Sequence, residues 1–268
     1  MLAAALALWA GAAAAGTTPS RVVSINLCTD QLAMLVAAPG QLVSVSALAT
    51  DPLASSMAQE AARYPRNRGS AEQVYLLHPD LVLAGEFTDA ATLDLLRRLG
   101  VNVVEVPVVT ALDEVPVQLR AVARAMGREA QGEALAREFT RDLASLESDL
   151  PAVAAALYYP NGYTTGGGTV ADDVLRHTGF FNIAGQAGLT GGGFMPLERL
   201  VMAAPRLIVT SRPYAGASRS EEILEHPALL ALRASARVEA VNDGDWLCGT
   251  PYILRAVAAM RDMRESLE

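Results

Sequence analysis

The histidines His78, His177 and His226 are the first side chains to consider for metal binding or general-base catalysis. Metal sites combine His, Cys and carboxylate ligands at short spacings, and a hydrolase needs a nucleophile beside its base. None of the three histidines has a second ligand at such a spacing, and the chain lacks a G-x-S-x-G elbow and a Walker phosphate loop. The sequence therefore predicts no catalytic residues, no resident metal and no cofactor.

A glycine-rich segment, "GYTTGGGTVADD" at 162–173, opens a predicted helix. Backbone N–H groups at such a place can bind an anion. The segment lacks the lysine of a nucleotide site, and its glycine spacing differs from the dinucleotide-binding fingerprint. A tight turn between a strand and a helix explains it equally well.

The two cysteines, Cys28 and Cys248, stand near opposite ends of the chain. In an oxidising compartment they would form one disulfide or remain as two thiols, and the sequence leaves both options open. Cys28 lies in "SINLCTDQ", without the small residues that precede a lipid-modified cysteine. A lipid anchor at this position is therefore not expected.

Two stretches repeat one pattern: "AEQVYLLHPDLVLAG" at 71–85 and "LERLVMAAPRLIVTS" at 197–211. Glu72 corresponds to Glu198, and each is followed seven residues later by a proline and then by a run of Leu, Val and Ile. The pattern predicts a short helix, a turn at the proline and a buried strand. Such corners recur in α/β proteins, but the acid at the same offset in both copies suggests a shared role.

The surrounding elements alternate between strand and helix in two separate parts of the chain. In the first part we expect strands at 21–27, 41–47, 80–85 and 101–109, with helices between them and Thr29 or Asp30 capping the first helix. In the second part we expect strands at 152–159 and 206–211 and a terminal helix at 251–265. This alternation predicts an α/β fold in which each part has a mostly parallel central sheet.

Between the two parts, residues 112–150 have a helical pattern with interruptions near Pro116 and Gly127. The later portion reads as a stiff connection, unlike a flexible Gly/Ser linker. We therefore expect an N-terminal α/β lobe at 21–127, a rigid interlobe helix at 128–150 and a C-terminal α/β lobe at 151–268.

In open α/β sheets, ligands bind at the carboxyl ends of the strands. Several of the scarce aromatic residues fall at such positions, together with polar side chains. We expect them to line a cleft that holds a large, flat or irregular ligand through aromatic area and a few polar contacts. These residues are Asn26, Cys28, Asp30, Tyr64, Glu86 and Phe87 in the first lobe, and Tyr163, Thr164, Phe194, Arg212, Tyr214, Trp246, Cys248 and Tyr252 in the second.

The N-terminal residues 1–15 are apolar and end in small residues, as in a secretory signal peptide cleaved before Gly16. The run is shorter than the roughly 20 residues of a spanning helix, although a transmembrane anchor is the alternative. The net charge of −8 argues against a nucleic-acid-binding protein. We expect an exported, monomeric protein.

The segments "RVVSINLCTDQL", "SAEQVYLLHPDLVLAG" with "LRRLGVNVVEV", and "YTTGGGTVADDVLRHTGFFNIAG" with "PLERLVMAAPRLIVTS" together resemble the periplasmic binding proteins of ABC importers for vitamin B12, ferric siderophores and haem. The resemblance covers residues 21–265 and keeps the order of the motifs. It implies two Rossmann-like lobes joined by one long rigid helix, with the ligand held between them and little hinge closure. It also implies delivery to a permease dimer in the inner membrane.

The resemblance gives individual residues a role. Family members carry one exposed glutamate per lobe that docks on permease arginines, and Glu72 and Glu198 match these acids by position. Siderophore binders often present arginines to an anionic chelate, for which Arg212 is the candidate. The vitamin B12 protein has several pocket tryptophans, whereas only Trp246 follows the signal segment here. Cys28 and Cys248 would face the cleft from opposite lobes, bridged or in contact with a metal chelate; burial as two small apolar side chains is the alternative.

The sequence thus predicts a periplasmic substrate-binding protein for a metal chelate, either a corrinoid, a ferric siderophore or haem. The alternatives are a binding protein for an oxyanion or a free metal ion, and an α/β enzyme with an active site between its lobes.

Overall fold

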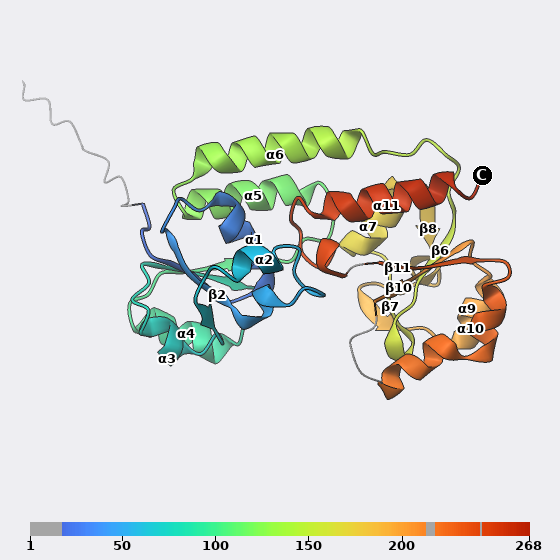
Figure 1. Cartoon of the computed structure of the whole chain (residues 1–268), viewed down its shortest axis with the longest axis horizontal. Coiled ribbons are helices and arrows are strands. Elements are labelled where there is room, and N and C mark those ends of the chain that lie inside the picture. Colours follow the sequence, from blue (N-terminus) through green and yellow to red (C-terminus); the bar gives the residue numbers. More distant parts are fainter. Residues whose placement is uncertain (1–17, 213–217, 242) are drawn as a thin grey trace, which may run out of the picture.

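The computed structural model describes residues 18–212, 218–241 and 243–268, so the predicted signal peptide and Tyr214 lie outside the described residues. The described chain forms two α/β lobes side by side, with a layer of helices along one side of both (Figure 1). The predicted fold class is confirmed.

The N-terminal lobe contains a five-stranded parallel sheet in the order β3-β2-β1-β4-β5. Strands β2 and β3 lie on one side of β1, and β4 and β5 lie on its other side. The order in which strands are added to the sheet therefore reverses between β1 and β4. Loops that follow these two strands therefore meet at a switch point. The strands are β1 (Val22–Ser24), β2 (Leu42–Ser46), β3 (Arg66–Asn67), β4 (Leu81–Gly85) and β5 (Val103–Val106).

Helices cover this sheet where the sequence has helical spacing. Ser70 caps its helix as predicted, because its side chain accepts a hydrogen bond from the backbone N–H of Gln73. The first helix is capped by Asn26, which accepts from the N–H groups of Cys28 and Thr29, and this corrects the expected cap at Thr29 or Asp30. The helices are α1 (Leu27–Val36), η1 (Ala47–Thr50), α2 (Ala58–Ala61), α3 (Ala71–Tyr75), α4 (Ala90–Arg98) and α5 (Glu114–Ala125).

The C-terminal lobe contains a four-stranded parallel sheet in the order β11-β10-β6-β8 and a separate antiparallel pair, β7-β9. The strands are β6 (Val153–Leu157), β7 (Tyr163–Thr165), β8 (Phe180–Asn182), β9 (Gly192–Phe194), β10 (Leu207–Ser211) and β11 (Arg237–Val241). The helices are η2 (Pro160–Gly162), α7 (Val170–His177), α8 (Ile183–Gln186), α9 (Leu197–Ala203), η3 (Arg219–Glu225), α10 (Pro227–Leu232), η4 (Asp243–Asp245) and α11 (Ile253–Glu265).

The chain passes from the first lobe to the second through α5 and α6 (Glu129–Ala144), which pack against each other along the top of Figure 1. Pro116 does not interrupt α5, because it lies in the first turn, where a missing N–H is tolerated. The helix expected at 128–150 ends at Ala144, and residues 145–152 continue to β6 without helical structure.

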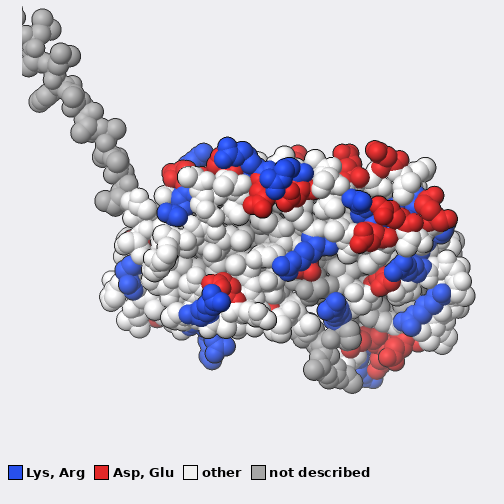
Figure 2. Space-filling model, turned by 45° about the horizontal axis from the view of Figure 1, so that its top comes forward, with Lys and Arg blue, Asp and Glu red and all other residues white. Residues whose placement is uncertain are grey.

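Acidic and basic side chains are interspersed on the face that carries α6, and the described part of this face has no extended basic patch (Figure 2). Among the residues placed by the structure, no helix has the length and hydrophobicity needed to cross a bilayer.

Candidate ligand-binding cleft

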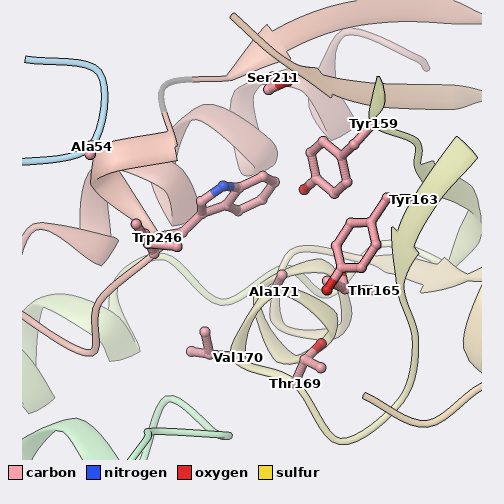
Figure 3. A pocket seen from close by; sticks show the side chains of 10 residues that line it. Ala54, Tyr159, Tyr163, Thr165, Thr169, Val170, Ala171, Ser211 and Trp246 are labelled. Atoms are coloured by element: carbon pink, nitrogen blue, oxygen red, sulfur yellow. The ribbon is translucent and has the colours of Figure 1, made fainter. Parts of the chain in front are cut away.

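A cavity of about 410 Å³ lies between the lobes and is lined mostly by the C-terminal part of the chain (Figure 3). The carboxyl ends of the neighbouring strands β6 and β10 contribute Tyr159 and Ser211, in accordance with the strand-end rule. The remaining lining residues come from the β7 strand, the start of α7, the segment after η4 and, for one alanine, the N-terminal lobe. They are Ala54, Tyr163, Thr165, Thr169, Val170, Ala171, Trp246 and Leu247.

Three aromatic rings of the C-terminal lobe form a continuous series; Tyr159 and Tyr163 line this cavity, and Phe194 lines a separate cavity of about 200 Å³. The ring centroids of Tyr159 and Tyr163 are 6.3 Å apart, and those of Tyr163 and Phe194 are 5.8 Å apart at an interplanar angle of 79°. A Cβ atom at Gly192 would overlap the Tyr163 ring, so this glycine leaves the space that the ring occupies. Figure 3 shows the Trp246 indole across the cavity from Tyr159 and Tyr163.

A second cavity of about 280 Å³ lies on the N-terminal-lobe side. Its lining includes Asn26 after β1, and Glu86 and Phe87 after β4, which lie at the switch point of the sheet. The Glu86 carboxylate accepts a hydrogen bond from the backbone N–H of Val108 at 3.0 Å, and Phe87 is 85% exposed. An exposed aromatic ring at a cavity is a suitable surface for an apolar ligand face.

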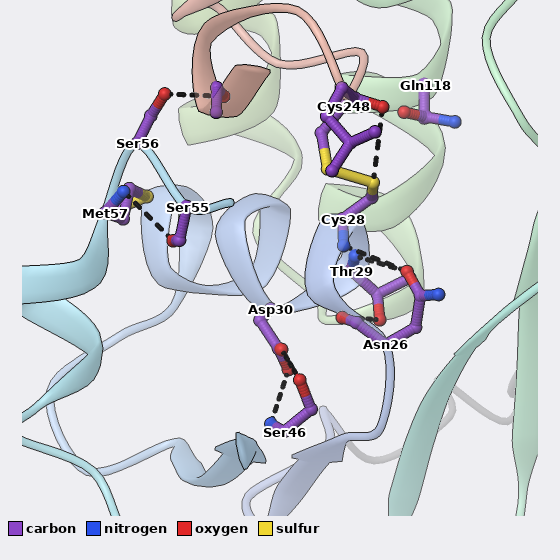
Figure 4. The surroundings of a disulfide bond; sticks show 12 residues. Asn26, Cys28, Thr29, Asp30, Ser46, Ser55, Ser56, Met57, Gln118 and Cys248 are labelled. Carbon is purple, nitrogen blue, oxygen red and sulfur yellow. Dashed lines mark hydrogen bonds between the residues drawn. A yellow bond between two sulfur atoms is a disulfide. The ribbon is translucent and has the colours of Figure 1, made fainter. Parts of the chain in front are cut away.

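Cys28 and Cys248 form a disulfide between the two lobes, with 5.1 Å between their Cα atoms (Figure 4). This arrangement selects the bridged option over two free thiols and over direct thiol contacts with a chelate. Cys28 and Leu247 both line the cavity on the N-terminal-lobe side, and Leu247 also lines the larger cavity. Cys248 itself is 1% exposed and lines neither cavity, unlike the ligand contact that the sequence predicts, whereas its neighbour Leu247 contributes to both.

Two predicted ligand contacts do not reach the cleft. Asp30 is fully buried and accepts hydrogen bonds from the backbone N–H and the hydroxyl of Ser46, at 3.0 and 2.5 Å. Burial raises the pKa of Asp30 to about 6, although the bonds from Ser46 oppose this shift. Thr164 is also fully buried, and its hydroxyl donates to the Leu157 carbonyl oxygen at 2.5 Å. Both side chains form hydrogen bonds within their own lobe.

Three further predicted contacts lie elsewhere among the described residues. Tyr64 packs against the hydrophobic core. Tyr252 lines a separate polar cavity, where the guanidinium of Arg255 stands 4.5 Å from its ring centroid. Arg212 is exposed after β10 and belongs to neither cavity described above.

The glycine-rich segment connects β7 to α7 and pairs with residues 189–191. The N–H groups of Gly166 and Gly167 donate to the carbonyl oxygens of Gly191 and Leu189, at 2.7 and 2.9 Å. Thr169 then caps α7, accepting from the N–H of Asp172. These bonds occupy the N–H groups of Gly166, Gly167 and Asp172 and tie the connection between β7 and α7 to residues 189–191.

Sequence reasoning missed Tyr159 and Ser211, although both end strands that the sequence predicts. Both could have been predicted from the rule that ligands bind at the carboxyl ends of strands. Leu247 and Gly249 could not be predicted from this rule, because their position at the cleft depends on contacts with the other lobe.

The described part of the chain has no group of three or more His, Cys, Asp or Glu side chains placed to hold a metal ion. A cleft lined by aromatic and hydroxyl groups between two α/β lobes, spanned by helices, is the architecture of a two-lobed binding protein. The chain belongs to the periplasmic binding protein family, which residues 22–238 match.

Individual relatives agree with this membership. The chain is 26% identical over 253 residues to a cobalamin-binding protein of Halobacterium salinarum, covering 90% of this chain and 68% of the relative. Among solved structures, it is similar to the apo form of the periplasmic heme-binding protein RhuT from a Roseiflexus species, with a TM-score of 0.77, 23% identity and coverage of 92% and 98%. It is also similar to the periplasmic vitamin B12-binding protein BtuF of Vibrio cholerae, with a TM-score of 0.71, 20% identity and coverage of 93% and 98%.

Proposed function

We propose that this protein is the periplasmic binding component of an ABC importer and that it captures a corrinoid between its lobes without altering it. The observation that carries this proposal is the composition of the larger cavity. Its described lining combines Tyr, Thr, Ser and Trp side chains with small apolar ones and contains no charged residue. A cobalamin-binding protein among the relatives supports the same ligand class.

Charge distinguishes the three candidate chelates. Haem carries two propionates and many ferric siderophores are anionic, so both are best bound by cations, whereas the corrin periphery bears neutral amides. Hydroxyl groups such as those of Thr169 and Ser211 are suitable partners for amides. A corrin ring is larger than the cavity, and the exposed rings of Phe87 and Phe194 extend the apolar surface available to it.

Delivery to a permease is the second part of the proposal, and it is supported by a feature repeated in both lobes. Glu72 and Glu198 are exposed in the first turns of α3 and α9, which in Figure 1 lie on the side of their lobes away from α6. The negative charge of Glu198 adds to burial in raising the pKa of Tyr158, next to the cavity residue Tyr159.

Each acid is followed, three and four residues later, by two exposed apolar side chains. In the first lobe these are Tyr75, the last residue of α3, and Leu76, its C-cap, exposed to 41% and 72%. In α9 they are Val201 and Met202, exposed to 36% and 84%. Positions i+3 and i+4 share a helix face with position i, so each lobe presents an acid beside an apolar pair. A two-fold permease with one basic and apolar patch per subunit suits this arrangement.

Ligand binding can be tested through Trp246, the only tryptophan besides Trp9. In the chain carrying Trp9→Phe, cyanocobalamin should quench the Trp246 emission with a Kd in the micromolar range or tighter, and equilibrium dialysis should give the same Kd. Free tryptophan at equal absorbance controls for inner-filter loss. Tight binding of haemin or ferrichrome, with none of cyanocobalamin, would reject the corrinoid and keep a chelate binder. Absence of binding for all three would reject the proposed function.

A further inference from the structure

We propose that the Cys28–Cys248 disulfide positions the wall of the ligand site formed by Trp246 and Leu247, so that reducing the bond weakens ligand binding while both lobes stay folded. The effect on ligand affinity rests on the function proposed above, whereas the effect on the wall itself does not.

Residues 244–250 belong to the C-terminal lobe in sequence, because they connect β11 to α11, but they contact the N-terminal lobe. The N–H of Gly244 donates to the carbonyl oxygen of Leu53 at 3.2 Å. The Ser56 hydroxyl lies 2.7 Å from the Gly244 carbonyl oxygen and 2.8 Å from the Asp245 carboxylate. These contacts hold the beginning of the segment on the N-terminal lobe (Figure 4).

The end of the segment is held by the disulfide and by close packing. Cys248 is buried in a small cluster with Leu27 and Ala54 of the N-terminal lobe. A Cβ atom at Gly249 would overlap the Val109 side chain, so the backbone approaches the N-terminal lobe as closely as a residue without a side chain permits. The disulfide is thus the second covalent connection between the lobes, after the chain through α5 and α6.

Trp246 and Leu247 lie between these two anchors. Trp246 is 5% exposed and faces Tyr159, which follows β6, and Tyr163 of the β7–β9 pair, both in the C-terminal lobe (Figure 3). One wall of the larger cavity is therefore attached to the N-terminal lobe and the opposite wall to the C-terminal lobe. The distance between the two walls of the cavity therefore depends on how firmly residues 244–250 are held on the N-terminal lobe. A cavity whose width is fixed before the ligand arrives favours binding.

Loss of the disulfide leaves the beginning of the segment anchored and releases its end. The hydrogen bonds of Ser56 remain and Trp246 still belongs to the main hydrophobic cluster, but the covalent restraint two residues away is lost. Cys28 stays on α1, whose core contacts through Leu32 and Val36 do not involve the bond. The hydrophobic cluster that contains Leu32 and Val36 extends through both lobes and includes neither cysteine, so both lobes stay folded when the wall loosens.

The reductant for the test is dithiothreitol. The disulfide takes up two electrons and two protons to give the Cys28 and Cys248 thiols, and dithiothreitol is oxidised to its cyclic disulfide. Iodoacetamide then traps the thiols, and intact mass counts them. The same chain with Cys28→Ser and Cys248→Ser lacks the bond without treatment and should not respond to dithiothreitol.

Two readouts on the Trp9→Phe background separate positioning from stability. Acrylamide quenching of Trp246 in the absence of ligand should increase in the reduced protein and in the double serine variant. The Kd for cyanocobalamin should rise by about tenfold or more in both, because the wall is no longer preorganised. Far-UV circular dichroism should stay unchanged.

Leu96→Ala is the matched control for stability, because Leu96 is fully buried in a core cluster of the N-terminal lobe that contains no cleft residue. It should lower the midpoint of thermal unfolding and leave both the quenching of Trp246 and the Kd unchanged. Unchanged Trp246 quenching on reduction would overturn the proposal, and so would unfolding of a lobe as soon as the bond is lost. If no chelate binds but Trp246 becomes more accessible, the wall is positioned as proposed and only the function assigned to the cleft fails.

Discussion

Tyr163 and Phe194 are opposite each other in the β7–β9 pair, and their rings meet edge to face with 5.8 Å between the centroids. Phe194 is nevertheless 71% exposed and Tyr163 is 40% exposed. Two aromatic rings that pack on each other and still face the solvent form a rigid apolar surface beside the cavity, with little conformational freedom to lose when a ligand binds.

Phe194→Ala should therefore weaken cyanocobalamin binding by about five- to tenfold, because an aromatic contact of this kind contributes roughly 1 kcal/mol. The Kd from Trp246 quenching measures the effect. Leu230→Ala, which truncates an exposed apolar side chain on α10, should leave the Kd unchanged. Equal Kd values for wild type and Phe194→Ala would remove Phe194 from the ligand surface.

The repeated acids lead to a prediction about the permease. The double variant Glu72→Gln, Glu198→Gln should keep its affinity for cyanocobalamin and lose the stimulation of ATP hydrolysis by the cognate transporter in proteoliposomes, because charges at the rim of an interface govern association. Leu76→Ala with Met202→Ala should reduce the stimulation by removing the exposed apolar partners of the acids.

The matched control removes the same number of negative charges as the Glu72→Gln, Glu198→Gln variant, one from each lobe. Asp94→Asn and Glu222→Gln remove exposed carboxylates from α4 and η3, outside the repeated motif, and should leave the stimulation intact. Full stimulation by the Glu72→Gln, Glu198→Gln protein would show that the repeated acids serve another purpose.

Asp30 makes the stability of the protein depend on pH. Burial raises its pKa from 3.8 to about 6, so the folded state holds the proton more tightly than the unfolded chain. Its stabilising contribution is complete below about pH 4 and is lost as the pH rises through 6. Asp30→Asn removes this titration. The difference in unfolding free energy between the variant and wild type should shift in favour of the variant by up to about 3 kcal/mol from pH 4 to pH 7.5.

Urea unfolding at several pH values measures this difference. Asp94→Asn, at an exposed position, should show no comparable trend. A difference between Asp30→Asn and wild type that stays constant with pH would mean that the Asp30 carboxyl titrates normally in the folded protein.

The alternation of strands and helices was predictable because buried strands and amphipathic helices leave separate periodicities in the sequence. The β4 strand and the Ser70 cap lie where the pattern indicates. The end of α6 was not predictable in this way. Leu143 and Leu146 continue the helical spacing, but both pack against the core while the chain leaves the helix after Ala144. The spacing of apolar residues predicts which side chains are buried. It does not predict where the helix ends, because buried side chains continue beyond Ala144.

The site was partly predictable, because position along the chain does not determine which way a side chain points. Cys28 faces the cleft, whereas Asp30 lies two residues further on the same helix, about 200° around its axis, and points to Ser46 of β2. Thr164 alternates with Tyr163 and Thr165 along β7 and points to the opposite side. The place of Leu247 depended on the disulfide, whose pairing the sequence left open.

Arg264 explains how α11 is fixed to the C-terminal lobe. It is 2% exposed, and its guanidinium donates to the carbonyl oxygens of Gly179 and Pro151, at 3.2 and 2.7 Å, and to the Glu268 carboxylate at 2.5 Å. Arg264→Met keeps most of the apolar volume but leaves the two carbonyl oxygens without this donor. We expect a loss of about 2–4 kcal/mol in unfolding free energy.

Arg261→Met is the control on the same helix. Arg261 pairs with Glu265 and donates to the Ser145 carbonyl oxygen, both at 2.9 Å, in a more exposed position, and its loss should cost less than about 1 kcal/mol. Chemical denaturation measures both variants, and the Kd for cyanocobalamin should stay unchanged because neither arginine lines the cavities between the lobes. Equal losses for the two variants would indicate that the burial of Arg264 adds nothing to the stabilisation by its contacts.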